Sequence, residues 1–142
     1  MRISEVLRAK GADVATIAPD ASVRHLLRLL ADRNIGAVVV SADGSTIDGI
    51  VSERDIVRRL GERGAALLDA PVSEIMTTHV RTCAPGDAVD GLRVTMTEHR
   101  IRHLPVVRDG RLVGIVSIGD VVKSTIAELE TEREQLVDYI KR

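Results

Sequence analysis

Apolar residues follow a helical spacing in two segments of the chain, residues 22–33 and 88–99. In the first segment Val23, Leu26 and Leu30 stand three or four positions apart, and the second segment repeats this spacing. Such a spacing gathers the apolar side chains on one face of a helix. We therefore predict two amphipathic helices, each of which buries one face against the rest of its unit.

A pair of strands is predicted after each of these helices. Each pair consists of two short apolar runs joined by a turn that contains Asp-Gly, a combination typical of a hairpin. The predicted strands are residues 37–41 and 48–51 in the first pair and residues 103–107 and 112–116 in the second. The flanking elements are a short helical turn opened by Ser4 or Ser73, an extended Thr-x-x-Pro segment at residues 16–19 or 82–85, and a final helix that begins at Ser52 or Ser117.

The same order of elements occurs twice because the chain is an internal repeat. Residues 14–44 and 80–110 align at a shift of 66 positions, and ten of the 31 aligned pairs are identical. Chance would give about two identical pairs at ordinary residue usage. We predict an α/β (α+β) fold of two tandem β-α-β-β-α units, residues 1–66 and residues 67–142, the second with a C-terminal helical extension. A linker is expected near residues 61–71, where Gly and Pro interrupt the pattern.

The composition is aliphatic and almost free of aromatic rings. Hydrophobic residues make up 44% of the chain, which excludes disorder, and there is no Trp, no Phe and a single Tyr, Tyr139. A nucleic-acid binder that stacks bases on aromatic side chains is therefore not expected. The net charge of −1 gives no general attraction to nucleic acid or to acidic membranes.

The single cysteine and the lack of long apolar runs indicate where in the cell the protein is expected. Cys83 is the only cysteine, so no internal disulfide and no thiolate-rich zinc site can form, and the four histidines have no metal-ligand spacing. The N-terminus lacks the apolar run of a signal peptide, and no apolar stretch approaches the roughly 20 residues that span a bilayer. We expect a cytoplasmic protein that has no metal and no contact with membrane.

Most of the candidate chemistry lies in the motif Gly-Ile-Val-Ser-x-x-Asp, which occurs at residues 49–55 and 114–120. One interpretation is structural, because Ser-x-x-Asp between a strand and a helix is a variant of the capping box. The other interpretation is a ligand site, because a helix N-terminus attracts phosphate and a nearby carboxylate can accept both hydroxyls of a ribose. Asp55 and Asp120 are the carboxylates in question, and Arg54 is suited to pair with a phosphate.

The ordered set of motifs resembles the cystathionine β-synthase (CBS) domain family. The set comprises Thr-x-x-Pro, then Ile-Arg-His-Leu-Pro-Val-Val, then the Asp-Gly turn, then Gly-Ile-Val-Ser-x-x-Asp, and the resemblance covers about residues 3–124. It implies a CBS pair, or Bateman module, in which two domains pack with a pseudo-two-fold relation. No residues are left for a catalytic domain, so a stand-alone CBS-pair protein is expected rather than an enzyme.

The resemblance further implies that adenosine-containing ligands (AMP, ADP, ATP, NAD or S-adenosylmethionine) bind in clefts between the two domains, with no obligatory cofactor. The implied ribose contacts are Asp55 and Asp120, with the hydroxyl groups of Ser52 and Ser117 near ribose or phosphate. The implied pocket edges are Thr16 and Thr82, and the implied adenine contacts are Ala37, Val38, His103, Leu104 and Pro105. Arg102 matches a basic residue that often reaches phosphate in the family.

The two copies differ at these positions, which predicts two inequivalent sites. The first copy has Gly36 where the second has Arg102, and it has Arg54 where the second has Gly119. We hypothesise that both sites bind, so that the chain senses adenine nucleotides and reports to a regulated partner that the sequence does not name. The alternative is an interaction or structural dimeric module with non-functional clefts, which the loss of basic residues at Gly36 and Gly119 favours.

Three further features are weaker candidates for a role in binding, redox chemistry or dimerisation. His79 and Arg81 precede Thr82 and are suited to touch a phosphate, although solvated surface charge is the default. Cys83 is either a redox group or a small buried hydrophobe. Residues 121–139 predict an uninterrupted helix that either lies on its own domain or forms a dimer seam. Since CBS pairs usually dimerise into a disc-like assembly, a homodimer is expected. The apolar positions of that helix are Val122, Ile126, Leu129, Leu136 and Ile140, with Arg133 on the same seam.

Overall fold

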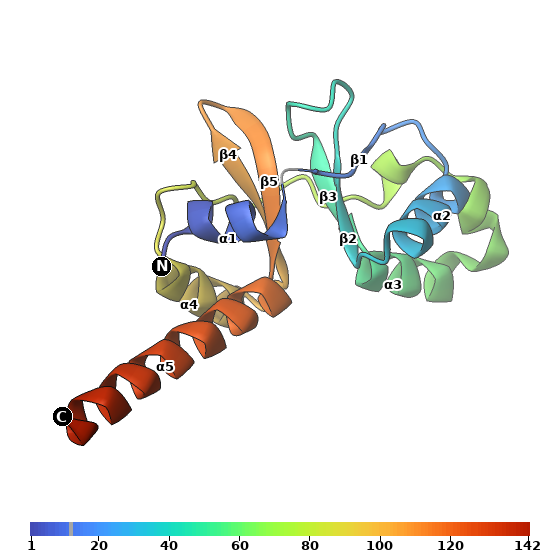
Figure 1. Ribbon diagram of the computed structural model, residues 1–142. Helices are drawn as coiled ribbons and strands as arrows, with labels where there is room; N and C mark the ends of the chain where they lie inside the picture. The colour runs from blue at the N-terminus through green and yellow to red at the C-terminus, as the bar shows by residue number, and fades with distance from the viewer. Residues whose placement is uncertain (12) are drawn as a thin grey trace. The chain divides into compact units, whose positions relative to one another are not determined.

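The computed structural model describes residues 1–11 and 13–142 (Figure 1). The elements of the first half are α1 (Ile3–Lys10), β1 (Thr16–Ile17), α2 (Val23–Arg33), β2 (Ala37–Val40), β3 (Gly49–Ser52), α3 (Glu53–Arg63) and the 3₁₀ helix η1 (Gly64–Asp69). The elements of the second half are the 3₁₀ helix η2 (Val72–Glu74), α4 (Val89–His99), β4 (His103–Arg108), β5 (Arg111–Ser117) and α5 (Ile118–Lys141). The fold is the predicted mixture of α and β, with the two amphipathic helices and the two strand pairs in the predicted places.

The two amphipathic helices α2 and α4 share the backbone conformation of their C-terminal caps but differ in the side chains at both caps. The hydroxyl of Ser22 accepts a hydrogen bond from the amide of His25 at the start of α2, whereas Ala88 offers α4 no side-chain cap. Both helices end on a residue in the left-handed conformation, Asn34 for α2 and Arg100 for α4. Asn tolerates that conformation well. The second helix therefore ends with less local support than the first.

The strands form two separate sheets. β1 pairs with β2 in parallel and β2 pairs with β3 in antiparallel register, in the order β1-β2-β3, while β4 and β5 form a two-stranded sheet. All four residues of β2 are buried, as is typical of a central strand. Ala37 lies opposite Ser52 in the β2–β3 ladder, so the start of one strand lies beside the end of the next.

The chain divides into two compact units that do not coincide with the two sequence repeats. One unit contains residues 1–11, 82–107 and 114–142, and the other contains residues 13–81 and 108–113. The short helix that opens each repeat therefore belongs to the unit built mainly from the other repeat. α1 packs with α5 in one unit, and η2 adds Val72 to the core of the other.

Two glycines leave room for α1 and η2, the two segments that pack in the unit built mainly from the other repeat. A Cβ atom on Gly114 would lie 2.6 Å from Cδ2 of Leu7 in α1, and a Cβ atom on Gly49 would lie 2.7 Å from Sδ of Met76, which follows η2. Any side chain at either position would overlap its neighbour. The glycine of each Gly-Ile-Val-Ser motif thus permits close packing of the neighbouring segment, as the repeated motif suggests.

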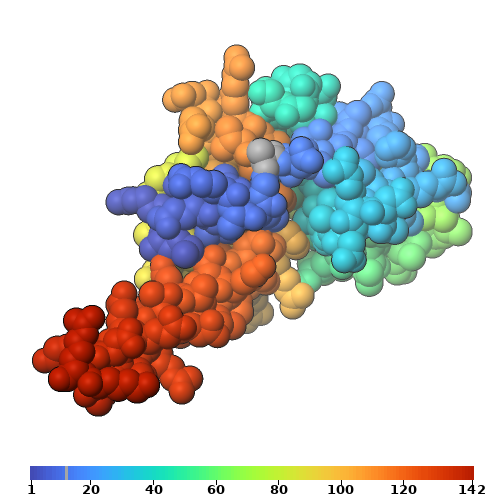
Figure 2. All heavy atoms as spheres, viewed as in Figure 1, coloured from blue at the N-terminus to red at the C-terminus, as the bar shows by residue number. Residues whose placement is uncertain are grey.

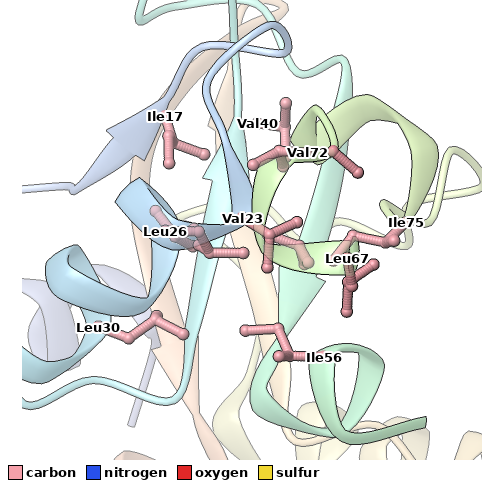
Figure 3. Packing of buried hydrophobic residues seen from close by; sticks show 12 residues of the cluster. Ile17, Val23, Leu26, Leu30, Val40, Ile56, Leu67, Val72 and Ile75 are labelled. Atoms are coloured by element: carbon pink, nitrogen blue, oxygen red, sulfur yellow. The ribbon is translucent and has the colours of Figure 1, made fainter. Parts of the chain in front are cut away.

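The core of the unit that contains α2 continues through the predicted linker. Leu67 in η1 is fully buried in the same core cluster as Val23, Leu26 and Ile56 (Figure 3). The segment near residues 61–71, predicted as a linker between the two repeats, is therefore folded into short helices that pack against this core. The Gly and Pro residues there mark the ends of short helices, whereas Leu67 supplies core volume.

The predicted openings of the first helical turns also need correction. α1 begins after Arg2 and η2 begins after Pro71, so Ser4 and Ser73 lie inside these helices and cap neither of them. In α1 the side chain of Glu5 accepts a hydrogen bond from the Arg2 amide instead. An acidic side chain in the first turn is favourable because it opposes the positive end of the helix dipole.

The long C-terminal helix α5 carries an exposed apolar row. Val121 is buried, but every residue from Thr131 to Arg142 is exposed, and the red end of the helix projects from its own unit (Figures 1 and 2). The predicted helix is confirmed, and only its first turns lie on α4 and α1. Among the helices that the structure describes, α5 included, none has the length and apolar content needed to cross a membrane.

Candidate functional site

Two strand-to-helix junctions carry the repeated Ser-x-x-Asp motif, one where β3 leads into α3 and one where β5 leads into α5. In each junction the serine hydroxyl accepts a hydrogen bond from the Asp amide, and Oδ2 of the Asp accepts one from the serine amide. The distance from Ser52 N to Asp55 Oδ2 is 2.8 Å, and from Ser117 N to Asp120 Oδ2 it is 2.9 Å. The predicted capping box is confirmed at both helices, where it satisfies amides that have no partner within the helix.

The capping box leaves one oxygen of each carboxylate available. Asp55 and Asp120 both use Oδ2 for the cap, and among the described residues neither Oδ1 accepts a hydrogen bond. Both side chains are partly exposed and lie in the first turn of a helix, where anions are favoured. The structural and the ligand-binding interpretations are therefore compatible, because the cap and a ligand can use different oxygens.

An arginine stands at each junction, but it comes from a different position in the two repeats. The amide of Ile118 donates to the carbonyl of Arg102 over 2.8 Å, and the amide of Glu53 donates to the carbonyl of Gly36 over 3.0 Å. Gly36, just before β2, thus lies against the first residue of α3, and Arg102, just before β4, lies against the first residue of α5. The backbone of Arg102 lies at the second junction in this way, and the first junction carries Arg54 in its helix instead. Both arginine side chains are exposed.

The strand residues expected to line adenine are mostly buried. The buried members of this group are Ala37, Val38, Leu104 and Pro105. Val38 is 0% exposed and Leu104 is 1% exposed, so their side chains belong to the cores and only their backbone atoms can face a ligand. His103 is partly exposed and opens β4. Since Ala37 pairs with Ser52, its backbone lies next to the first junction.

The Thr-x-x-Pro segments run beside the strands. Thr16 is partly exposed in β1, and Thr82 is exposed next to Cys83, which forms a parallel bridge with Val106. The thiol of Cys83 is buried and lies 3.6 Å from the carbonyl oxygen of Pro105. Burial raises the pKa of this thiol to about 12. Cys83 thus stays protonated at neutral pH, which favours the buried-hydrophobe interpretation over a redox group.

Lys10 is a further residue at the second junction that the sequence did not indicate. Its Nζ lies 2.7 Å from Oδ2 of Asp120 and 2.9 Å from the carbonyl oxygen of Ile115. Burial disfavours the ionised carboxyl, but the hydrogen bonds from Lys10 and from the Ser117 amide, with the charge of Lys10, lower the pKa of Asp120. Asp55 forms no ion pair with any described residue.

The Lys10–Asp120 contact joins residues 110 positions apart. The only sequence signal near it is the similarity of residues 3–7 to residues 72–76, which indicates equivalent helical turns. That similarity does not tell which unit each turn joins. The contact follows from the exchange of α1 into the unit that contains α5.

Comparisons with known proteins identify one family for the whole chain. The sequence profile described as CBS domain matches residues 3–62 and again residues 72–126. The chain is 35% identical over 147 residues to the mitochondrial CBS domain-containing protein CBSX3 of Arabidopsis thaliana, an alignment that covers 98% of this chain and 71% of the relative.

Two solved structures are also similar. The crystal structure of a CBS-domain containing protein from Agrobacterium tumefaciens has a TM-score of 0.85 and 44% identity, and the match covers 88% of this chain and 99% of that one. The CBS domain pair of protein MJ0100, in complex with 5′-methylthioadenosine and S-adenosyl-L-methionine, has a TM-score of 0.79 and 25% identity, with coverage of 90% and 98%.

Proposed function

The chain belongs to the CBS domain family, and on this premise we propose that it is a regulatory module that binds adenosine-containing ligands at its two Ser-x-x-Asp junctions. AMP, ADP, ATP and NAD are the proposed ligands, and a partner protein reads the occupied state. The observation that carries the proposal is the unused Oδ1 of Asp55 and of Asp120, each at a helix N-terminus beside an arginine. The complex of the MJ0100 pair with two adenosine derivatives supports this ligand class.

Each part of such a ligand has a proposed counterpart at the junctions. A ribose diol suits the Asp carboxylate because two hydroxyl groups can donate to its oxygens. A phosphate suits the helix N-terminus and the arginine, Arg54 at the first junction and Arg102 at the second. The backbone of β2 and β4 offers hydrogen bonds to adenine without any aromatic ring. The remaining proposed contacts are Ser52, Ser117, Thr16, Thr82 and His103.

The proposed mechanism is differential binding rather than turnover. A ligand that binds one conformation more tightly shifts the population toward it, and a partner that recognises this conformation then responds. Such a module needs no nucleophile or general base, so we propose that the chain is not itself an enzyme. We also propose a cytoplasmic location, consistent with a single cysteine that is buried and protonated.

A titration of the full chain with AMP, ATP and NAD tests the proposal. Asp55→Asn and Asp120→Asn remove a charge but keep an oxygen that can accept the capping hydrogen bond. We expect each variant to lose one of two binding events in isothermal titration calorimetry. Asp32→Asn on the exposed surface of α2 is the matched control and should bind like the wild type. Unchanged binding in both junction variants would contradict the proposal.

The exposed apolar row of α5 favours a second candidate function, an interaction module that dimerises with or without ligand. Ile126, Leu129, Leu136 and Ile140 are 51–79% exposed, and together with Arg133, which stands between Leu129 and Leu136, they follow the alternating spacing of three and four residues found in coiled coils. We propose that α5 pairs with its counterpart in a homodimer. A ligand screen by thermal shift separates the two functions, because only the sensor is stabilised by nucleotides.

A further inference from the structure

The ion pair between Lys10 and Asp120 makes the two junctions chemically different. Lys10 is the last residue of α1, and Asp120 is the third residue of α5. Both side chains are partly accessible, at 36% and 22% exposure, so the pair can open without unfolding the unit. At the first junction Asp55 has no such cation among the described residues.

The oxygen atoms of the two carboxylates are occupied differently. Oδ2 of Asp120 accepts from the Ser117 amide at 2.9 Å and from Lys10 Nζ at 2.7 Å, which uses both of its lone pairs. Oδ2 of Asp55 accepts from the amide and the hydroxyl of Ser52, at 2.8 and 3.1 Å. A hydroxyl hydrogen can rotate away, whereas a charge-assisted hydrogen bond is stronger. Asp55 can therefore offer two oxygens to a diol, but Asp120 offers only Oδ1 while Lys10 is bound.

The partner of Lys10 on β5 shows why this cation can leave. In the other unit the carbonyl of Ile50 accepts a hydrogen bond from the amide of Thr77 over 2.9 Å. The corresponding carbonyl of Ile115 accepts from the side chain of Lys10 instead. A side chain on a flexible stem can detach and be solvated, whereas a paired backbone amide cannot leave without moving its segment. Among the described residues, a cationic side chain that can be displaced from the carboxylate is thus found at the second junction and not at the first.

We infer that Lys10 is an internal competitor of the ligand at the second junction, so that a ribose diol binds Asp120 only by releasing Lys10. This inference rests on the proposed function, because it concerns the same ligand and the same carboxylate. It assigns the higher affinity for neutral nucleosides to the first junction. Ligand binding at the second junction would thus release Lys10, the residue at the C-terminal end of α1.

Adenosine is the probe that tests the inference, because it carries the diol but no phosphate that Lys10 could attract. In an Asp55→Asn background only the second junction remains, and Lys10→Met should tighten adenosine binding about fivefold, as expected for the loss of one partly exposed ion pair. Arg8→Met removes the same charge from an exposed position of α1 and should leave the affinity unchanged.

The outcomes separate the inference from the proposed function. Unchanged or weaker adenosine binding in the Lys10→Met variant overturns the inference, even where Asp120→Asn abolishes binding and so upholds the function. If the double variant Asp55→Asn, Asp120→Asn binds like the wild type, the proposed function itself fails.

A second readout needs no substitution and remains informative if Lys10→Met does not fold. Saturating adenosine should increase the rate at which an amine-acetylating reagent modifies Lys10 in the wild-type chain, measured by mass spectrometry of the peptide. Acetylation of Lys123, an exposed residue of α5, provides the internal reference. Equal Lys10 acetylation with and without adenosine overturns the inference.

Discussion

At the residue scale, Gly49 and Gly114 occupy equivalent positions but face different kinds of neighbour. A Cβ atom on Gly49 would lie 2.9 Å from the backbone oxygen of Thr77 as well as 2.7 Å from Met76 Sδ, whereas the three atoms nearest to a Cβ atom on Gly114 all belong to the side chain of Leu7. A methyl group can rotate away, but a backbone oxygen held in a strand bridge cannot. We expect Gly49→Ala to lower the free energy of unfolding by about 1–3 kcal/mol, and Gly114→Ala by less.

Urea unfolding of both variants measures this difference. Gly91 in α4 provides the control, because a Cβ atom there would meet nothing within 4 Å. Gly91→Ala should raise stability by about 0.5–1 kcal/mol through its better helix propensity. If Gly114→Ala proves as destabilising as Gly49→Ala, the exchanged helix α1 is held as rigidly as the bridge at Thr77.

The ion pair of Asp120 gives stability a defined pH dependence. The pKa of Asp120 in the folded chain lies below its ordinary value of 3.8, despite the opposing effect of burial, because of Lys10 and the Ser117 amide. Its contribution is therefore fully present above pH 3.8 and is lost as the pH falls through the lower, folded-state pKa. We expect Asp120→Asn to cost about 1 kcal/mol at pH 7, a value limited by the partial exposure of the pair.

The difference in the free energy of unfolding between the wild type and Asp120→Asn should shrink as the pH falls below 3.8. Urea unfolding of the wild type and of Asp120→Asn, at neutral and at acidic pH, measures it. Asp32→Asn corrects for the general effect of removing a surface carboxylate. A difference that stays constant through the acidic range would show that Asp120 stabilises the fold as a hydrogen-bond acceptor and not as a charge.

At the scale of the elements, α5 has more apolar surface than its own unit covers. Its exposed positions Ile126, Leu129 and Leu136 lie on one side, and Arg133 interrupts the row. The homodimer proposed above predicts that Leu129→Asp shifts the mass in solution from that of a dimer to that of a monomer, because a carboxylate buried in a helix pair is strongly unfavourable. Light scattering coupled to size exclusion measures the mass.

Two comparisons make the α5 experiment specific. Glu130→Asp changes an exposed polar position next in sequence and should leave the mass unchanged. Truncation after Ser124 removes the row but keeps the buried Val121, so the unit should stay folded as a monomer. A dimer that persists in both Leu129→Asp and the truncated chain would exclude the seam on α5.

Individual elements could be predicted from the sequence because their signals are local. The spacing of Val23, Leu26 and Leu30 determines which face of α2 is buried, and Ser52 and Ser117 cap the helices in which they were predicted. The burial of Leu67 could not be predicted, because the Gly and Pro residues near it indicate only a boundary between the repeats. Such signals mark where a helix ends, and they carry no information on whether the next residue is buried.

The same limit applies to the candidate site. Both caps and Arg54 could be found from motifs, since each lies within a few residues of its helix, whereas Arg102 precedes β4 and is indicated only by the family resemblance. Lys10 could not be found, because its partner is 110 positions away and depends on which unit α1 joins. An apolar pattern shows that a segment needs a partner surface, and it does not say which of two similar surfaces will supply it.

At the scale of the whole molecule, a fragment cut at the boundaries of a sequence repeat differs from one cut at the boundaries of a folded unit. Residues 1–66 form one complete repeat, but they lack Leu67, Val72 and Ile75, which belong to the core cluster around α2 (Figure 3). They also retain α1, whose apolar face belongs to the other unit. Residues 13–81 contain every member of that cluster. We therefore expect residues 13–81 to fold better than residues 1–66, although both are of similar length.

Circular dichroism and urea unfolding of the two fragments test this expectation. Residues 13–81 should show helix content and a cooperative transition, because their core cluster is complete. Residues 1–66 should unfold without a clear transition, since removal of even one large core side chain typically costs about 2–5 kcal/mol and a small domain has little stability to lose. Within residues 13–81, Leu67→Ala should abolish the transition and Leu68→Ala should preserve it, because Leu67 is fully buried and Leu68 is partly exposed. Equal cooperativity of both fragments would mean that the repeat, and not the exchanged unit, is what folds.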